Sequence, residues 1–327
     1  MDAMMQYYSG YEAPLLSKLI DTGNLLAGWR RVRDNHGCAG ADGVTIEEFE
    51  YKLPTNLSLL AKEISCRRYR PLPLLRILVD KGNRESRALS VPTVRDRLAQ
   101  SAALNILEPV FEAQFEHCSY AYRKRYSWQQ AVQKIIDYYD QGYRWVLDAD
   151  INALFDSVPH DKLLDKVERV VQDKELCHLT SLWVRAEIWD GTQVSRLIKG
   201  IPQGSVISPM LANLYLDELD GELLNKGIRL VRYADDFVVL CKTREKATAA
   251  AQLTKDVLKG MELSLDESDI VSFEQGFRFL GVVFLRSDAL IPFGKERKPQ
   301  KVRYVPPPMN PKAYWARLLP GQNTRKE

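Results

Sequence analysis

Two adjacent aspartates, Asp235 and Asp236, interrupt an otherwise apolar part of the chain, and this feature constrains the fold most. The surrounding residues 228–242, IRLVRYADDFVVLCK, are rich in β-branched and aromatic types, which predicts two short strands about a tight Ala-Asp-Asp turn. Two carboxylates about 4 Å apart repel each other by about 4 kcal/mol at an effective dielectric constant of about 20. A bound cation would remove that repulsion, although aspartate is also common in turns for conformational reasons alone.

A second group of carboxylates ends another predicted strand. Residues 143–151, YRWVLDADI, are aromatic and β-branched, and side-chain alternation along a strand places Asp148 and Asp150 on one face. Between the two groups lies GIPQGSVISP at 200–209, which predicts a rigid loop before a helix. Glycines in such loops let the backbone approach a ligand closely. Taken singly, the segment that ends in Asp148 and Asp150 is equally well interpreted as an exposed strand end. The segment at 200–209 is equally well interpreted as a plain connector.

Considered together, the three segments predict a centre for two metal ions. Mg²⁺ prefers oxygen ligands and is commonly held by one or two carboxylates together with substrate phosphates. The candidate ligands are Asp150, Asp235 and Asp236, with the carbonyl oxygen of Ile151 as a further one. Two such ions activate an attacking hydroxyl and neutralise the leaving oxygen of a phosphoryl displacement. We expect Mg²⁺, with Mn²⁺ as a substitute.

The charge of the chain is distributed unevenly around this acidic centre. The net charge is only +3, but residues 61–100 carry ten Lys and Arg against four Asp and Glu, and residues 295–327 carry nine against two. Basic side chains interleaved with an aromatic one, as in Arg67-Arg68-Tyr69-Arg70, suit a polyanionic backbone. We therefore predict nucleic-acid contacts by Arg67, Arg68 and Arg70, with a solvated basic face as the alternative.

Periodicity and capping residues predict the remaining elements. Apolar residues at helical spacing and candidate caps at Thr93 and Ser127 indicate helices. The expected helices span 93–116, with a break or kink near its end at Pro109, and 127–141, 160–171, 208–226 and 244–260. Strands are expected within 270–285. The proline-rich, basic residues after 285 predict an extended tail.

Composition and targeting signals limit the class of protein. With 45% hydrophobic and 27% charged residues the chain is neither fully disordered nor collagen-like. No apolar run approaches the roughly 18 residues that a membrane span needs. The N-terminus lacks the basic start and apolar core of a secretory signal. We therefore expect a cytoplasmic protein without membrane contact.

Three motifs are the strongest of several that occur in a fixed order, namely YADDFVVL at 233–240, GIPQGSVISPMLANLYLDELD at 200–220 and DINALFDSVPH at 150–160. With these motifs the chain resembles the reverse transcriptases of the bacterial group II intron lineage. Further similar segments lie at 40–45, 80–100, 107–112, 119–123 and 279–282. The resemblance extends over about residues 38–285.

This resemblance implies an α+β fold with the palm and fingers of a right-hand polymerase and little or no thumb. It divides the chain into an N-terminal extension at 1–60, fingers and the start of the palm at 61–147, the palm with its catalytic carboxylates at 148–285, and a basic proline-rich tail at 286–327. The implied activity is that of an RNA-directed DNA polymerase, a nucleotidyltransferase. Its partners would be an RNA template, a DNA or RNA primer, and deoxynucleoside triphosphates.

The resemblance also implies roles for single residues. Lys81 and Arg87 would hold the incoming triphosphate, and Gln203 would line the nucleotide pocket. Phe155 would be the steric gate, whose ring fills the space that a ribose 2′-hydroxyl needs. The residues implied to bind nucleotide are Lys81, Arg87, Ala153, Leu154, Phe155 and Gln203. Arg123, in the block SYAYR, is expected to contact nucleic acid.

The departures from the family pattern bear on the biological role. Arg87-Ala88-Leu89 replaces the usual Arg-Pro-Leu, Lys124 replaces a proline, and Glu267-Ser268 replaces a Lys-Thr pair near the primer grip. The chain has little room for a maturase thumb after residue 285, which favours an enzyme that serves CRISPR spacer acquisition, an antiviral defence, beside a partner integrase. The alternatives are a truncated intron maturase and a non-catalytic nucleic-acid-binding subunit.

Overall fold

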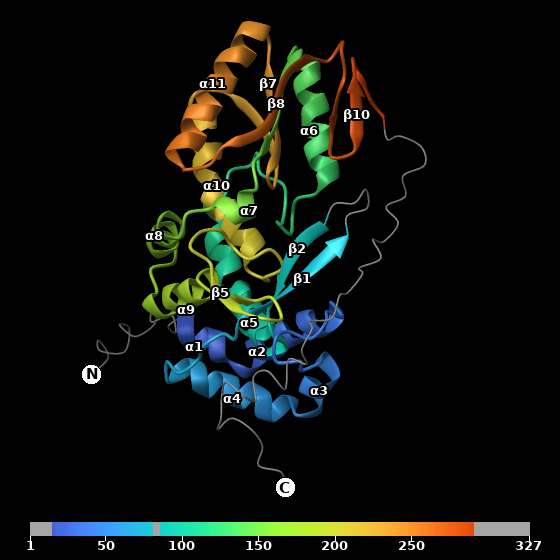
Figure 1. Ribbon diagram of the computed structural model, residues 1–327. Helices are drawn as coiled ribbons and strands as arrows, with labels where there is room; N and C mark the ends of the chain where they lie inside the picture. Colours follow the sequence, from blue (N-terminus) through green and yellow to red (C-terminus); the bar gives the residue numbers. More distant parts are fainter. Residues whose placement is uncertain (1–14, 81–85, 291–327) are drawn as a thin grey trace, which may run out of the picture.

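The two strands predicted around the paired aspartates lie in a four-stranded antiparallel sheet, here called the central sheet (Figure 1). This arrangement is seen in a computed structural model, which describes residues 15–80 and 86–290. The strand order is β6-β7-β3-β8. The strands are β6 (Arg229–Tyr233), β7 (Asp236–Cys241), β3 (Trp145–Ile151) and β8 (Leu265–Ser272).

The two faces of the central sheet carry two separate apolar layers. Alternation along a strand sends Leu147 and Phe237 to one face, where they join the main core with α10 (Ser208–Asn225) and α11 (Arg244–Gly260). Val146 and Val238 face the other way and pack with α6 (Trp128–Asp140) and a small sheet of order β11-β10-β9 (Figure 1). Its strands are β9 (Phe277–Phe279), β10 (Val282–Leu285) and β11 (Asp288–Leu290).

The N-terminal part of the chain surrounds one long helix, α5 (Val94–Glu112), which has fully buried alanines at Ala99, Ala102 and Ala103. Small side chains let neighbouring helices approach it closely. The helices of this part are α1 (Leu15–Ile20), α2 (Thr22–Asp34), α3 (Ile46–Tyr51) and α4 (Leu53–Ser65).

A second sheet, of order β2-β1-β4-β5, joins segments that lie far apart in the sequence (Figure 1). Its strands are β1 (Leu74–Asp80), β2 (Ser86–Val91), β4 (Glu187–Trp189) and β5 (Val194–Arg196). The connection from the central sheet runs through α7 (Leu154–Ser157), α8 (His160–Val171) and α9 (Lys174–Val184). The predicted α+β class is confirmed.

Most predicted elements are present. The helices α8 and α11 have the predicted limits, and the side chains of Thr93 and Ser127 accept the capping hydrogen bonds expected of them. Helix α5 ends at Glu112 rather than at residue 116, three residues after Pro109. The stretch predicted as a tail begins with β11, which pairs with β10, while residues 291–327 lie outside the described part. No helix within the described ranges is both long and apolar enough to span a bilayer.

The loop before α3 is tied closely to the start of α5, which gives a stability prediction. A Cβ atom on Gly40 would lie 2.6 Å from the Cα and 2.7 Å from the nitrogen of Thr93. We expect Gly40→Ala to lower the free energy of unfolding by about 1–3 kcal/mol, because backbone must move to admit the methyl group. Gly221→Ala in α10 is the control, since nothing lies within 4 Å of its Cβ and a helical alanine gains up to about 1 kcal/mol. Equal denaturation midpoints for Gly40→Ala and wild type would contradict this packing.

Candidate active site

The hairpin between β6 and β7 places the paired aspartates at the edge of the central sheet. Tyr233 and Asp236 pair across the two strands, so the turn contains only Ala234 and Asp235. The predicted three-residue turn is therefore one residue shorter, and Asp236 is the first residue of β7. Ala234 has a φ of +63°, in the left-handed region that few residues other than glycine adopt.

Asp150 lies directly beside this turn, although 85 residues separate it from Asp235 in the sequence. Strands β3 and β7 are antiparallel, and Asp150 is paired with Asp236. Cross-strand partners have Cα atoms about 4.5–5.5 Å apart, with both side chains on one face. The backbone N–H of Ile151 donates a hydrogen bond of 3.2 Å to the carbonyl of Asp235. All three aspartates are half-buried, so the structure brings the three predicted carboxylates together.

The electrostatics of this group follow from burial and from mutual repulsion. Burial raises the pKa of Asp236 to about 7, and the carboxylates of Asp148 and Asp150 add to the rise. Burial and the charge of Asp235 raise the pKa of Asp150 to about 6. Burial also raises the pKa of Asp148 to about 6, with Asp269 on β8 contributing next. Negative charge is therefore concentrated where a cation would be most strongly attracted.

The donor set suits an ion that completes its shell with substrate oxygens. Within residues 15–80 and 86–290, no three His, Cys, Asp or Glu side chains form a ready-made metal site. Mg²⁺ typically takes one or two protein carboxylates and keeps its other positions for water and phosphate. The register of β3 against β8 shifts between Ala149 and Ile151, and such a bulge re-aims the side chain at that point, here Asp150.

The carboxylate group gives a pH-dependent stability prediction. Because the folded-state pKa of Asp236, about 7, lies above its ordinary value of 3.8, folding is favoured by the protonated form. That stability is fully present below about pH 4 and is lost as the pH rises through about 7. We expect Asp236→Asn to raise the melting temperature in metal-free buffer near pH 8, and the gain to shrink toward pH 5.

Asp165→Asn is the control for this measurement, because Asp165 is exposed on α8. Its melting temperature should follow that of the wild type at each pH. A gain for Asp236→Asn that did not change with pH, or a loss near pH 8, would contradict the raised pKa.

The loop GIPQG at 200–204 packs against the helix that carries the predicted steric gate. The N–H of Ile201 donates to the carbonyl oxygen of Phe155 at 2.6 Å. Gly200 has a φ of +89°, and a Cβ there would lie 2.8 Å from the same oxygen, so only glycine fits. Phe155 and Leu154 are buried, while Ala153, with a left-handed φ of +42°, is exposed.

Two predicted nucleotide-binding residues contact each other directly. The Nε of Arg87, on β2, donates to Oε1 of Gln203 at 2.6 Å, and the N–H of Ser90 donates to the carbonyl of Gln203 at 2.6 Å. The second sheet is thereby joined to the loop at 200–204. The guanidinium of Arg87 is exposed and keeps further donors for an anion. Lys81, the other cation predicted to hold nucleotide, lies outside the described residues.

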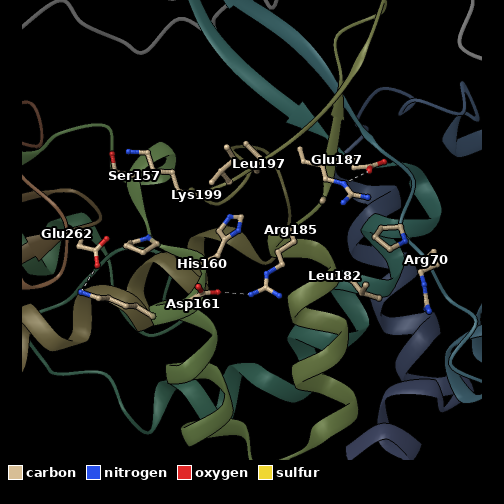
Figure 2. A pocket seen from close by; sticks show the side chains of 16 residues that line it. Arg70, Ser157, His160, Asp161, Leu182, Arg185, Glu187, Leu197, Lys199 and Glu262 are labelled. Atoms are coloured by element: carbon tan, nitrogen blue, oxygen red, sulfur yellow. Dashed lines mark hydrogen bonds and ion pairs between the residues drawn. The ribbon is translucent and has the colours of Figure 1, made fainter.

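Arg70, one of the three predicted basic residues, lines a cavity of about 950 Å³ (Figure 2). Arg67, Arg68 and Arg70 are all exposed. Arg67 pairs with Glu175, and Arg70 donates to the carbonyls of Arg67 and Tyr69 at 3.1 and 2.7 Å. Figure 2 shows Arg70 and Lys199 on opposite sides of the cavity. Of the three predicted cations, Arg67 already has its Nε and Nη2 donors on the carboxylate of Glu175.

Arg123 is enclosed by the protein rather than exposed at its surface. Its side chain is buried, its Nε and Nη2 donate to Glu112, and its Nη1 donates to the carbonyls of Glu116 and Ser119 at 2.6 and 2.7 Å. An enclosed guanidinium must satisfy its donors locally. The prediction that Arg123 contacts nucleic acid disagrees with this placement, because the donors that would bind phosphate are used inside the protein.

Two residues near the carboxylates, Tyr122 and Arg232, were not predicted from the sequence as part of the site. Tyr122 is 49% exposed and has a φ of +60°. Burial and the nearby charge of Asp235 raise its pKa, while Arg87 lowers it, so Tyr122 lies near both groups. Arg232 is completely buried on β6. A charged residue within an apolar strand was the available signal for Arg232, whereas Tyr122 had no distinct one.

Known proteins are similar to this chain over most of its length. The family described as "Reverse transcriptase (RNA-dependent DNA polymerase)" matches residues 79–284. Protein YkfC of Escherichia coli (strain K12) is 30% identical over 290 aligned residues, covering 76% of each chain. Group II intron-encoded protein LtrA of Lactococcus lactis subsp. cremoris is 27% identical over 303 residues, covering 70% of this chain and 50% of LtrA.

A solved structure, the "Partial Cas6-RT-Cas1--Cas2 complex", is also similar. It has 27% identity and a TM-score of 0.48, and the match covers 76% of this chain and 42% of that one. The chain therefore spans about half the length of LtrA and less than half of the solved chain.

Proposed function

Because the chain belongs to the reverse transcriptase family, we propose that it synthesises DNA on an RNA template at the carboxylate edge of the central sheet. The observation that carries this proposal is the pairing of Asp150 with Asp236, with Asp235 in the adjoining turn. Asp150, Asp235 and Asp236 would hold two Mg²⁺ ions, and the carbonyl of Ile151 would add a ligand. When bound, such a pair of ions supplies charge neutralisation at the attacking and leaving oxygens.

The side chains around the carboxylates position the nucleotide. Arg87 would bind the triphosphate through donors that Gln203 leaves unused, and Gln203 orients that guanidinium through the 2.6 Å hydrogen bond. Lys81 is proposed as a second cation on the triphosphate. Phe155, held by the bond from Ile201 to its carbonyl, would exclude a 2′-hydroxyl. Positioning of this kind supplies much of the rate of phosphoryl transfer.

The template would be held through its phosphates by exposed cations, among them Arg67, Arg68 and Arg70. Each neutralised phosphate releases counterions, so affinity should fall steeply with salt. In this proposal the contacts fix the position of the strand without reading its bases.

Primer extension tests the proposed function directly. Purified protein, an RNA template with an annealed DNA or RNA primer, and deoxynucleoside triphosphates should give extended product with Mg²⁺ or Mn²⁺ and none with a chelator. A folded protein that binds the primer–template but never extends it would instead support the alternative of a non-catalytic nucleic-acid-binding subunit.

The biological setting is a narrower proposal, taken from the sequence resemblance. We propose that the enzyme copies RNA for CRISPR spacer acquisition and associates with the acquisition integrase. Affinity purification of the tagged chain from its own cells should recover that integrase. Recovery of an intron RNA without the integrase would contradict this setting and favour an intron maturase.

A further inference from the structure

We propose that Arg232 is a positioning residue for nucleotidyl transfer, which fixes the hairpin that carries the catalytic aspartates. This inference rests on the proposed function of Asp235 and Asp236. Arg232 lies on β6, two residues before Ala234, and its side chain is completely buried together with its ion-pair partner Asp220. It touches no predicted metal ligand through its side chain, so its effect would act through the backbone of the turn.

Every N–H donor of this guanidinium has an acceptor. A guanidinium carries five such donors in a rigid planar fork. Nε and Nη2 donate to the two carboxylate oxygens of Asp220 at 2.8 and 2.5 Å. Nη1 donates to Oδ1 of Asn213 and to the carbonyl of Ala234, both at 3.0 Å, and Nη2 donates to Oγ of Ser119 at 2.8 Å. The five bonds leave no donor to spare.

The bond to Ala234 explains why a single arginine matters to the turn. A two-residue hairpin turn with a positive φ at its first position favours glycine there, whereas this chain has alanine at +63°. The carbonyl of Ala234 belongs to the peptide group that leads into Asp235. Holding that carbonyl fixes the plane of the peptide group and therefore the direction in which Asp235 leaves the turn.

The guanidinium is itself anchored on two rigid parts of the fold. Asn213 and Asp220 are both on α10, which packs under the central sheet. On the other side, the segment at 118–121 runs beside β6, since the N–H of Arg232 donates to the carbonyl of Cys118 at 2.8 Å and its carbonyl accepts from Tyr120 at 2.9 Å. Asn213 also donates to the carbonyl of Ala121 at 2.8 Å. The orientation of the turn is thus determined by α10 and by this segment together.

Lysine cannot replace arginine in this position. Its ammonium has three donors at a single point, whereas the acceptors here are distributed around a planar fork. Arg232→Lys keeps the charge that Asp220 needs but cannot reach all the acceptors at once. The bond to Ala234 is the one whose loss would reorient Asp235.

The test compares Arg232→Lys with Arg95→Lys. Arg95 is half-buried on α5, and its guanidinium also holds a carboxylate and a backbone carbonyl, namely Glu63 at 2.9 Å and the carbonyl of Arg70 at 2.5 Å. Both substitutions should lower the melting temperature. Mn²⁺ affinity, measured by electron paramagnetic resonance without turnover, should fall at least about threefold in Arg232→Lys and stay within about twofold of wild type in Arg95→Lys.

Primer extension separates this inference from the proposed function. We expect the kcat of Arg232→Lys to fall at least about tenfold and its half-saturating Mg²⁺ concentration to rise, with neither change in Arg95→Lys. Wild-type protein that binds Mn²⁺ without extending primers would count against the proposed function only. Equal Mn²⁺ affinities in the two variants would overturn the role of Arg232.

A milder variant covers the case in which Arg232→Lys does not fold. Ser119→Ala removes one acceptor of Nη2 and leaves the contacts to Asp220 intact. The buried Nη2 donor that loses its partner should lower the melting temperature modestly. A Mn²⁺ affinity lowered about twofold or more, at a melting temperature no lower than that of Arg95→Lys, supports the positioning role. An unchanged affinity contradicts it.

Discussion

Asp235→Ala is expected to abolish RNA-templated primer extension while leaving primer–template binding intact. Asp235 lies in the two-residue turn beside Asp150 and Asp236, where we propose that the metal ions bind. Metal ions supply several kcal/mol of charge stabilisation in the transition state, and each 1.36 kcal/mol corresponds to a factor of ten in rate. We therefore expect extension to slow by about a thousandfold or more, measured as single-nucleotide incorporation with enzyme in excess.

The stability of the same variant distinguishes loss of chemistry from loss of fold. Asp235 raises the pKa of Asp150, so removing its charge relieves repulsion. Asp235→Ala should therefore melt at or above the wild-type temperature in metal-free buffer. Asp165→Ala, at an exposed position of α8, should match the wild type in both assays. Extension by Asp235→Ala within tenfold of the wild-type rate would show that this carboxylate is not a catalytic ligand.

Phe155→Val is expected to let the enzyme incorporate ribonucleotides. Phe155 is only 7% exposed, and the hydrogen bond from Ile201 to its carbonyl fixes the start of α7. A smaller side chain would open the space that the aromatic ring is proposed to deny to a 2′-hydroxyl. Steric discrimination of this kind is worth about 10–200-fold. We expect the ratio of kcat/KM for a deoxynucleotide over its ribonucleotide to fall by roughly that factor.

The cost of this substitution to stability must be separated from its effect on selectivity. Truncating a buried phenylalanine fully to alanine costs about 3–5 kcal/mol, and valine should cost less. Leu163→Val, at a fully buried position of α8, removes volume from the same core but leaves the Phe155 side chain unchanged. It should lower stability and leave selectivity unchanged. An unchanged preference for deoxynucleotides over ribonucleotides in Phe155→Val would show that Phe155 is not the steric gate.

The parts of the site that the sequence predicted are those with strong local signals. The paired aspartates lie at a two-residue turn between strands that their β-branched and aromatic residues identify directly. Asp148 and Asp150 end a strand of similar composition, and they do share one face. Thr93 and Ser127 are correct as caps because a capping hydrogen bond involves only the next few residues.

The parts that could not be predicted depend on contacts between distant segments. Strand β4 pairs with β1 across more than a hundred residues, and nothing local specifies that partner. Arg123 was misinterpreted because the fork that suits a phosphate suits the carboxylate of Glu112 equally well. The importance of Arg232 depends on Asp220 and Ser119, which only the folded chain brings together.

The most direct test of the carboxylate centre is a crystal structure of the protein with primer–template, an incoming nucleotide and Mn²⁺, whose anomalous scattering locates the ions. We predict two ions at the edge of the central sheet, each about 2.1 Å from an oxygen of Asp150, Asp235 or Asp236 and in contact with the triphosphate. Ions bound elsewhere, or a nucleotide bound away from these aspartates, would contradict it.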